Sequence, residues 1–150
     1  MQTIADFALS ATGGKDFRLS ATSGKFLLLY FYPKDNTPGC TTESQQFRDL
    51  HEAFSELDCL ILGISRDSIK SHENFKSKFE LPFDLLSDPE EQACGLFGVI
   101  KQKMMYGKAV RGIERSTFLI DAEKNIVKEW RGVKADGHAA EVLNFLKSIS

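Results

Sequence analysis

The spacing of hydrophobic and polar residues predicts alternating strands and helices. Phe26–Tyr32 is apolar throughout, which is typical of a strand covered on both faces. Cys59–Ile64 has the same character and predicts a second buried strand. Between these two segments, Phe47, Leu50 and Phe54 recur at helical spacing. Two buried strands joined by a helix are expected to lie parallel, with a right-handed crossover.

Weaker patterns add hairpins and further helices. One hairpin is predicted around Thr12-Gly13-Gly14-Lys15, and a second pairs Ser116–Ile120 with Ile126–Trp130. Further helices are predicted over Ser68–Phe79, over a short segment opened by Asp88-Pro89, and over Asp136–Ile149. The fold class is therefore α/β, a mixed sheet with helices on both faces and an N-terminal β-hairpin. No linker or internal repeat divides the sequence, so residues 1–150 are expected to form a single domain.

The composition is that of an ordinary globular domain. The 150 residues include 19 Lys and Arg against 21 Asp and Glu, a net charge of −2, and 42% are hydrophobic. These values argue against a disordered chain and against a strongly basic nucleic-acid-binding protein. The longest apolar run is far shorter than the roughly 20 residues of a membrane span, and the N-terminus lacks the pattern of a signal peptide. We therefore expect neither nucleic acid nor a membrane as a partner.

The cysteine content indicates a reducing compartment. Three cysteines are an odd and low number that does not suit a disulfide framework. We therefore expect a cytoplasmic protein. In that setting a cysteine with special surroundings is catalytic or redox-sensing rather than structural.

Cys40 has such surroundings. It lies three residues after Thr37, the predicted helix cap, and Pro38 suits the first helical position. Unpaired N–H groups and the positive end of the helix dipole favour a thiolate there. Thr37 lies one turn before Cys40 and can direct its hydroxyl at the volume above the sulfur, which Pro33 can shield from water. The alternatives are an inert buried cysteine and a threonine that only caps the helix.

Two segments resemble the peroxiredoxins, most closely their bacterioferritin comigratory protein or peroxiredoxin Q branch. Tyr30–Thr41 is similar to the active-site segment of that branch, and Gly112–Asp121 is similar to its later signature. The similarity runs from about Phe7 to the last predicted helix. The resemblance implies a thioredoxin fold and the thiol-dependent reduction of hydrogen peroxide and organic hydroperoxides.

The resemblance also implies a role for each of four residues. Cys40 matches the peroxidatic cysteine, and Thr37 matches the residue that hydrogen-bonds the peroxide. Pro33 matches the shielding proline and Arg115 the active-site arginine, which without the resemblance we would interpret as an ordinary surface residue. Arg115 and Thr37 would stabilise the charge that develops on the leaving oxygen. Cys40 would end as a sulfenic acid. No cofactor is expected.

The resemblance is incomplete in the residue that would resolve the sulfenic acid. Many members of the branch have a cysteine where this chain has Gln45, and others have one on the next helix, but Ser68–Phe79 contains none. We expect Cys59 to be a core residue, and Cys94 either packs inertly or forms a disulfide with Cys40. The leading hypothesis is a monomeric one-cysteine enzyme recycled by thioredoxin, glutaredoxin or a small thiol. The alternatives are a two-cysteine mechanism through Cys94 and a peroxide-sensing redox switch.

Other candidate residues are less specific. His51, His72 and His138 lack zinc-like spacing, so no metal site is expected. We expect Glu43 to be solvated near the helix start. Met104–Tyr106 either packs as a loop beside the site, which we favour, or forms an apolar collar for organic peroxides.

Overall fold

The computed structural model describes residues 2–150, apart from the side chain of Met105. Met1, where the predicted domain starts, lies outside the described residues. The strands are β1 (Gln2–Thr3), β2 (Ala8–Ala11), β3 (Lys15–Arg18), β4 (Phe26–Phe31), β5 (Cys59–Ser65), β6 (Leu85–Ser87), β7 (Ile100–Met105), β8 (Lys108–Ile113), β9 (Ser116–Asp121) and β10 (Asn125–Arg131). The helices are the 3-10 helix η1 (Leu19–Ala21) and α1 (Pro38–Asp49), α2 (His51–Glu56), α3 (Ile69–Lys78), α4 (Gln92–Phe97) and α5 (His138–Ile149).

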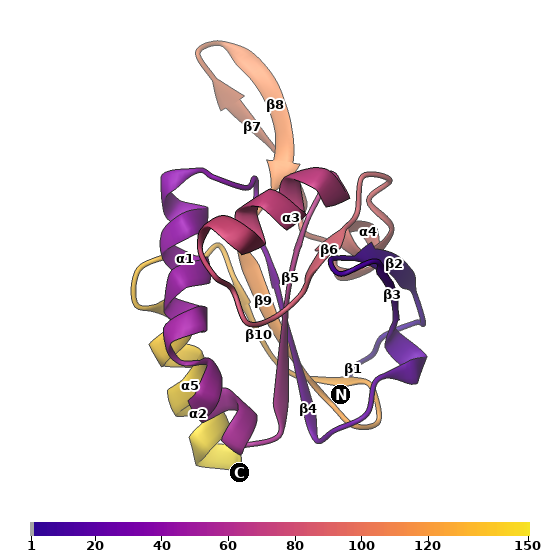
Figure 1. The fold of residues 1–150 in the computed structure, drawn as a ribbon. Helices are drawn as coiled ribbons and strands as arrows, with labels where there is room; N and C mark the ends of the chain where they lie inside the picture. Colours follow the sequence, from indigo (N-terminus) through magenta and orange to yellow (C-terminus); the bar gives the residue numbers. More distant parts are fainter. Residues whose placement is uncertain (1) are drawn as a thin grey trace.

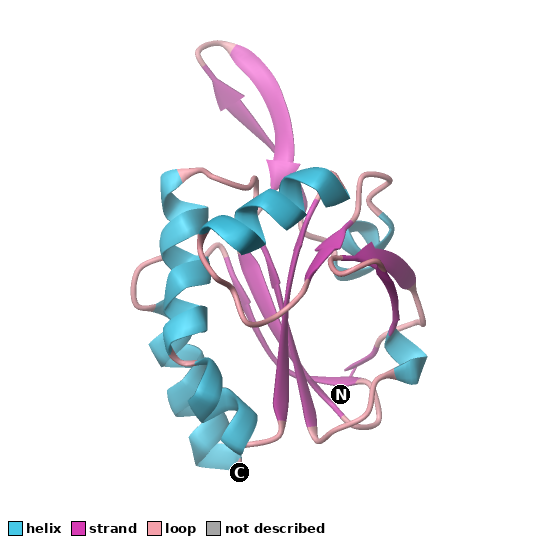
Figure 2. Cartoon of the chain, viewed as in Figure 1, coloured by secondary structure: helices cyan, strands magenta, loops and turns pink. Residues whose placement is uncertain are grey.

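One mixed sheet organises the molecule (Figures 1 and 2). Its strand order is β1-β10-β9-β4-β5-β6-β2-β3. The pairs β4–β5 and β5–β6 are parallel, and the other pairs are antiparallel. The parallel crossover from β4 to β5 and both predicted hairpins, β2–β3 and β9–β10, are confirmed. Every residue of β4 is buried, as its continuous apolar run predicts.

Alternate residues of β4 build two apolar layers. Leu27, Leu29 and Phe31 face a cluster completed by α4 and the N-terminal segment. Leu28 and Tyr30 face the opposite cluster, to which α1, α2, α3 and α5 contribute. This confirms the expected helices on both faces. It also means that a residue can be assigned to one side of the sheet by the cluster it joins.

Two helices differ most from their predicted extents. The helix predicted through Phe54 is interrupted at Leu50, which separates α1 from α2. The short helix begins at Gln92 rather than at Asp88-Pro89. Asp88 still acts at its start, because its carboxylate accepts hydrogen bonds from the N–H groups of Gln92 and Cys94 at 2.7 and 2.8 Å.

The β7–β8 hairpin is an element that the hydrophobic pattern does not predict. It pairs Ile100 with Ile113 and Met105 with Lys108, and it projects from the body of the molecule (Figure 1). Tyr106 and Gly107 form its turn with φ of 53° and 78°, as a two-residue type I′ turn requires. Met104 is 71% and Tyr106 is 99% exposed, so the packing expected for these two residues is wrong. The pattern fails because residues on both faces of this hairpin are exposed.

Across residues 2–150, no helix has both the length and the apolar character that crossing a bilayer demands.

The packing at the centre of β5 generates a prediction. A Cβ atom on Gly63 would lie 2.8 Å from Tyr30 Cζ and 2.8 Å from Leu85 Cδ2. Gly63→Ala must displace one of these buried side chains, so we expect a loss of about 1–3 kcal/mol in the free energy of unfolding, measured with urea. Gly95→Ala in α4 is the control, because a Cβ there meets nothing within 4 Å. Equal stability of the two variants would contradict this account of the core.

Candidate active site

Cys40 lies in the first turn of α1. The helix begins at Pro38, directly after the loop that follows β4, and the Thr41 N–H makes its first backbone bond to the Thr37 carbonyl at 2.9 Å. Pro38 therefore occupies the first helical position, as predicted. Cys40 is only 1% exposed and joins the cluster on the helix-rich side of the sheet. The sulfur is buried at the end of the helix where unpaired N–H groups and the positive end of the dipole lie.

Arg115 contacts this sulfur although the two residues are 75 positions apart in the sequence. Its Nη2 donates to Cys40 Sγ at 3.5 Å, and its Nη1 donates to Glu43 Oε1 at 2.8 Å. The side chain of Arg115 is only 16% exposed, so the surface position that its residue type alone suggests is wrong. The structure thus brings together two of the four residues predicted for the site, Cys40 and Arg115.

Glu43 lies on the same helix as Cys40. It was expected to be solvated, but it is fully buried one helical turn after Cys40. Burial raises its pKa to about 7, and the charge and hydrogen bond of Arg115 oppose this increase. Among the described residues, its Oε2 atom has no hydrogen-bond partner. The i, i+3 spacing from Cys40 was a signal that the two side chains share one helix face.

The guanidinium is also held by backbone contacts. A Cβ atom on Gly39 would lie 3.0 Å from Arg115 Nη2, so the guanidinium rests directly against the first turn of α1. The Arg115 carbonyl accepts a hydrogen bond from the Val133 N–H at 3.1 Å. The backbone and the tip of Arg115 are therefore both fixed.

Thr37 and Pro33 lie on the loop before α1. Thr37 occupies the cap position, but its hydroxyl donates to the Lys34 carbonyl at 2.8 Å and does not bond a helix N–H, so the predicted side-chain cap is wrong. Thr37 is half-buried and Pro33 is exposed. Because the Thr37 hydroxyl proton is used within the loop, its oxygen is left as an acceptor.

The other two cysteines are also free thiols. Cys59 lies on the same side of the sheet as Cys40, and burial raises its pKa to about 12. Cys94 lies in the opposite cluster, where burial and the nearby Asp88 carboxylate raise its pKa well above the ordinary value. A disulfide between Cys40 and Cys94 would have to join residues on opposite faces of the sheet.

Comparison with known proteins identifies the family. Residues 1–129 match the model of the AhpC/TSA family. The chain belongs to this family. It is 52% identical to peroxiredoxin Bcp of Bacillus subtilis over 149 residues, which cover 99% of this chain and 95% of the relative. It is also 52% identical to peroxiredoxin Bcp of Xanthomonas campestris over 143 residues, 95% of this chain and 89% of the relative.

Solved structures agree with this placement. The bacterioferritin comigratory protein of Xanthomonas campestris, studied for its alkyl peroxide reduction activity, superposes with a TM-score of 0.91 at 51% identity, covering 95% of this chain and 91% of that one. The thioredoxin fold of the peroxiredoxins, expected from the resemblance, is thereby confirmed. The chain is a peroxiredoxin of the Bcp or peroxiredoxin Q branch, and it is a thiol-dependent peroxidase.

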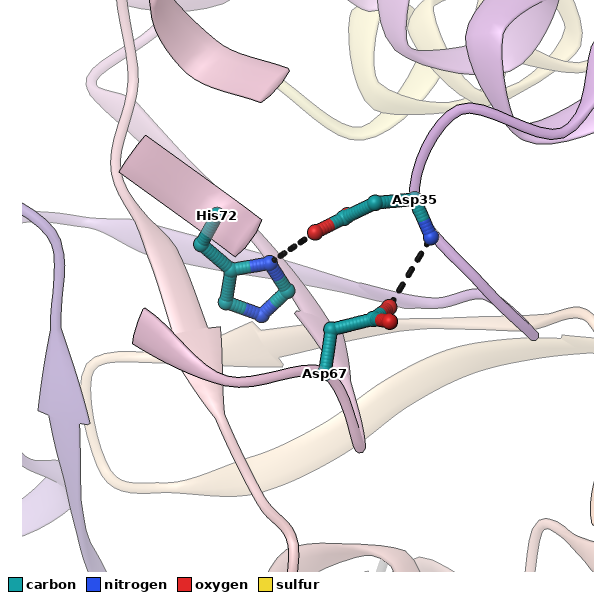
Figure 3. A group of neighbouring side chains, drawn as sticks. All are labelled: Asp35, Asp67 and His72. Atoms are coloured by element: carbon teal, nitrogen blue, oxygen red, sulfur yellow. Dashed lines mark hydrogen bonds and ion pairs between the residues drawn. The ribbon is translucent and has the colours of Figure 1, made fainter. Parts of the chain in front are cut away.

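A buried carboxylate anchors the loop that precedes α1 and Cys40 in this peroxiredoxin. Asp35 Oδ1 accepts from the Tyr32 hydroxyl at 2.6 Å, and Oδ2 accepts from Ser71 Oγ at 2.7 Å. Oδ2 also lies 2.8 Å from His72 Nδ1 (Figure 3). Burial alone would raise the pKa of Asp35, but these hydrogen bonds, led by that of His72, hold it below its usual value. The loop is therefore tied to α3 by a charged group.

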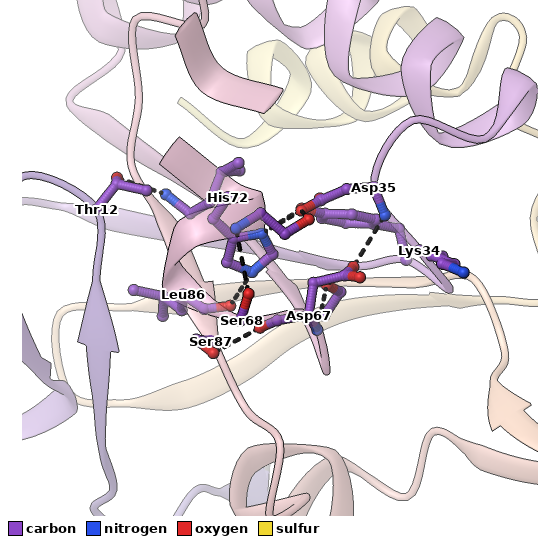
Figure 4. Close-up of polar contacts among 12 residues, drawn as sticks. Thr12, Lys34, Asp35, Asp67, Ser68, His72, Leu86 and Ser87 are labelled. Atoms are coloured by element: carbon purple, nitrogen blue, oxygen red, sulfur yellow. Dashed lines mark hydrogen bonds and ion pairs between the residues drawn. The ribbon is translucent and has the colours of Figure 1, made fainter. Parts of the chain in front are cut away.

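His72 and Asp67 extend this anchor to the neighbouring strands (Figure 4). His72 Nε2 lies 2.9 Å from the Leu86 carbonyl, and Asp67 Oδ2 accepts from the Asp35 N–H at 2.9 Å. Asp35, Asp67 and His72 bring ligand-type atoms within 4.8 Å of one another, an arrangement that a search for histidine and cysteine spacing overlooks. Since these atoms are already hydrogen-bonded, we interpret the group as the anchor of the loop.

The anchor generates a prediction for stability. Asp35→Ala leaves the buried His72 and Tyr32, and the half-buried Ser71, without their common acceptor, so we expect the free energy of unfolding to fall by about 3–5 kcal/mol. Urea denaturation followed by circular dichroism measures the change. Asp49→Ala, at an aspartate whose side chain is 62% exposed, should stay within about 0.5 kcal/mol of the wild type. A loss at Asp35 no larger than this control would show that the anchor is not structural.

Glu43 generates a prediction for the pH dependence of stability. Its pKa is higher in the folded protein, about 7, than the ordinary value of 4.5, so the folded state binds more protons between these values. The contribution of Glu43 to stability therefore falls as the pH rises through this window, by roughly 3 kcal/mol at most. Glu43→Gln removes this titration. Urea unfolding at about pH 5 and about pH 8 should show the variant gaining stability relative to the wild type at the higher pH.

The matched control is Glu52→Gln, at an exposed residue of the neighbouring α2. Its difference from the wild type should be the same at both pH values. If the Glu43 variant behaves in the same way, burial does not perturb that carboxyl group.

Proposed function

We propose that Cys40 is the peroxidatic residue of this peroxiredoxin. The observation that supports this most directly is the 3.5 Å hydrogen bond from Arg115 Nη2 to Cys40 Sγ in the first turn of α1. A guanidinium charge and the positive end of a helix dipole both stabilise a thiolate. Only the thiolate is an effective nucleophile toward a peroxide.

In the proposed step, the Cys40 thiolate attacks one peroxide oxygen in line with the O–O bond. An S–O bond forms and the O–O bond breaks, and the second oxygen leaves with the electron pair and takes up a proton. The products are a sulfenic acid on Cys40 and either water or an alcohol. The substrates are hydrogen peroxide and organic hydroperoxides, and the alkyl peroxide reduction activity studied in the Xanthomonas relative supports the organic ones.

The surrounding groups have distinct parts in this step. Arg115 donates to the leaving oxygen, where negative charge develops. Its other guanidinium nitrogen, Nη1, donates to Glu43 Oε1 at 2.8 Å. The Thr37 hydroxyl donates to the Lys34 carbonyl, so its oxygen is available to accept a hydrogen bond from the O–H of the peroxide. The first-turn N–H groups of α1 add positive potential, and Pro33 shields the substrate from bulk water.

We propose that an external thiol completes the cycle, as in a one-cysteine mechanism. Thioredoxin, glutaredoxin or a small thiol would attack the Cys40 sulfenic acid. The raised pKa of Cys94 and its position across the sheet from Cys40 count against an internal disulfide. The odd and low number of cysteines fits a reducing cytoplasm, where we place the enzyme as a monomer.

The cysteine roles generate a prediction for activity. Cys40→Ser should abolish peroxide reduction, because the nucleophile is lost, whereas Cys94→Ser should keep most of it. Rapid mixing with hydrogen peroxide, followed through the single tryptophan, Trp130, measures the oxidation step. Intact mass without reductant, after one equivalent of peroxide, should show one added oxygen on the wild type.

Each alternative has its own outcome in this experiment. Full activity of Cys40→Ser would overturn the assignment. Loss of thiol-driven turnover in Cys94→Ser, with an internal disulfide in the wild type, would establish the two-cysteine cycle. Normal oxidation without turnover by any thiol would indicate a redox switch.

A further inference from the structure

The β7–β8 hairpin is a positively charged arm. Residues 100–113 contain Lys101, Lys103, Lys108 and Arg111 and no Asp or Glu, a formal charge of +4. Subtracting this from the net charge of −2 leaves −6 for the rest of the chain. The hairpin projects from the end of the molecule where α1 begins (Figure 1). The arm is therefore a segment of net positive charge on an otherwise acidic protein, at the end of the molecule where α1 begins.

The strand register gathers three lysines on one face of the arm. Lys103 pairs with Val110 and Lys101 pairs with Gly112, so these residues share a face with Lys108, two residues before Val110. We call Lys101, Lys103, Lys108 and Val110 the lysine face. All four are exposed, and Val110 adds an apolar surface that is 39% exposed. Arg111 lies on the other face and pairs with Glu91.

The lysine face carries charge that the described residues do not neutralise in ion pairs. Among the ion pairs of the described residues, none includes Lys101, Lys103 or Lys108. Uncompensated charge of one sign on a surface attracts partners of the opposite sign and accelerates their association. An occupant of this face therefore has an acidic surface.

The base of the arm is connected to the candidate active site. β8 leads through Glu114 directly to Arg115, which contacts the Cys40 sulfur. Arg66 Nη2 donates to the Arg111 carbonyl at 3.4 Å, and the next residue, Asp67, accepts from the Asp35 N–H in the Cys40 loop. A protein bound to the arm would lie at the end of the molecule that contains the sulfur.

We propose that the lysine face docks the acidic thiol protein that reduces Cys40. This inference rests on the proposed one-cysteine cycle. A thiolate of the partner attacks the Cys40 sulfenic acid, an S–S bond forms, and the hydroxyl leaves as water after taking up a proton. The partner's second thiol then attacks the partner's own sulfur in the mixed disulfide. Cys40 returns to the thiolate, and the partner dithiol, which has supplied two electrons, becomes a disulfide.

The lysine face lies at the end of the molecule where α1 begins, and this location favours a thiol protein over a second copy of the chain or a nucleic acid. The cycle requires a thiol that arrives from outside, because Cys59 and Cys94 are buried with raised pKa values. A thiol carrier, unlike a nucleic acid, must reach the Cys40 sulfur in order to act.

The test compares a neutral small thiol with an acidic protein thiol. The variant is the triple substitution Lys101→Glu, Lys103→Glu, Lys108→Glu, and the reductants are dithiothreitol and a reduced thioredoxin of net negative charge. At low ionic strength, kcat/KM for the thioredoxin should fall at least about tenfold, because attraction becomes repulsion. The difference should shrink at high salt. Turnover with dithiothreitol and the rate of Cys40 oxidation by peroxide should stay unchanged within about twofold.

The control is Lys25→Glu, Lys70→Glu, Lys147→Glu, which changes the net charge equally at exposed lysines outside the arm. An equal loss in the control, or an unchanged kcat/KM in the arm variant, would overturn the docking proposal. So would sedimentation of the wild type as a dimer that the arm variant dissociates, because the face would then bind a second copy. Failure of Cys40 to react with peroxide in the wild type would instead refute the proposed function.

Discussion

The buried ion pair between Glu43 and Arg115 determines the geometry around Cys40. Taking a carboxylate and a guanidinium out of water is unfavourable for each ion alone, so each depends on the other to remain in place. Glu43 lies on α1 and Arg115 lies between β8 and β9, so their contact ties the start of the helix to a distant part of the sheet. The second guanidinium nitrogen then points to the sulfur. Gly39 makes this possible, because the absence of a side chain lets the guanidinium lie on the helix backbone.

The central sheet separates the thiols into two chemical environments. Cys40 and Cys59 belong to the layer beneath α1, α2, α3 and α5, whereas Cys94 belongs to the layer beneath α4. Only Cys40 lies at the start of a long helix beside a cation. The three cysteines of this chain thus have different surroundings because of their place in the packing.

Local sequence patterns predicted the centre of the fold and one residue of the site. The apolar run of β4 and the Thr37, Pro38, Cys40 spacing depend on neighbouring residues, so the strand, the helix start and the cysteine position could be inferred directly. The resemblance to peroxiredoxins added Arg115, which is 75 residues from Cys40 and has no local signal.

Features that depend on distant contacts were not predicted. A glutamate on an amphipathic helix is normally exposed. Glu43 is buried because its carboxylate pairs with Arg115, which lies far away in the sequence. The Asp35–His72 anchor spans 37 residues. Neither face of the β7–β8 hairpin is consistently apolar, so apolar and polar residues do not alternate along its strands. Its turn has tyrosine at a position where Asn, Asp or Gly is usual.

The burial of Cys40 has a consequence for how the two half-reactions of the proposed cycle compete. Cys40 is only 1% exposed, so a peroxide and the cysteine of another protein meet the same barrier to its sulfur. The bulkier protein needs the wider opening around the first turn of α1, so in the proposed cycle the repair of the sulfenic acid is the more hindered of the two reactions. The frequency of that opening would then set the peroxide concentration at which over-oxidation to the sulfinic acid outpaces repair.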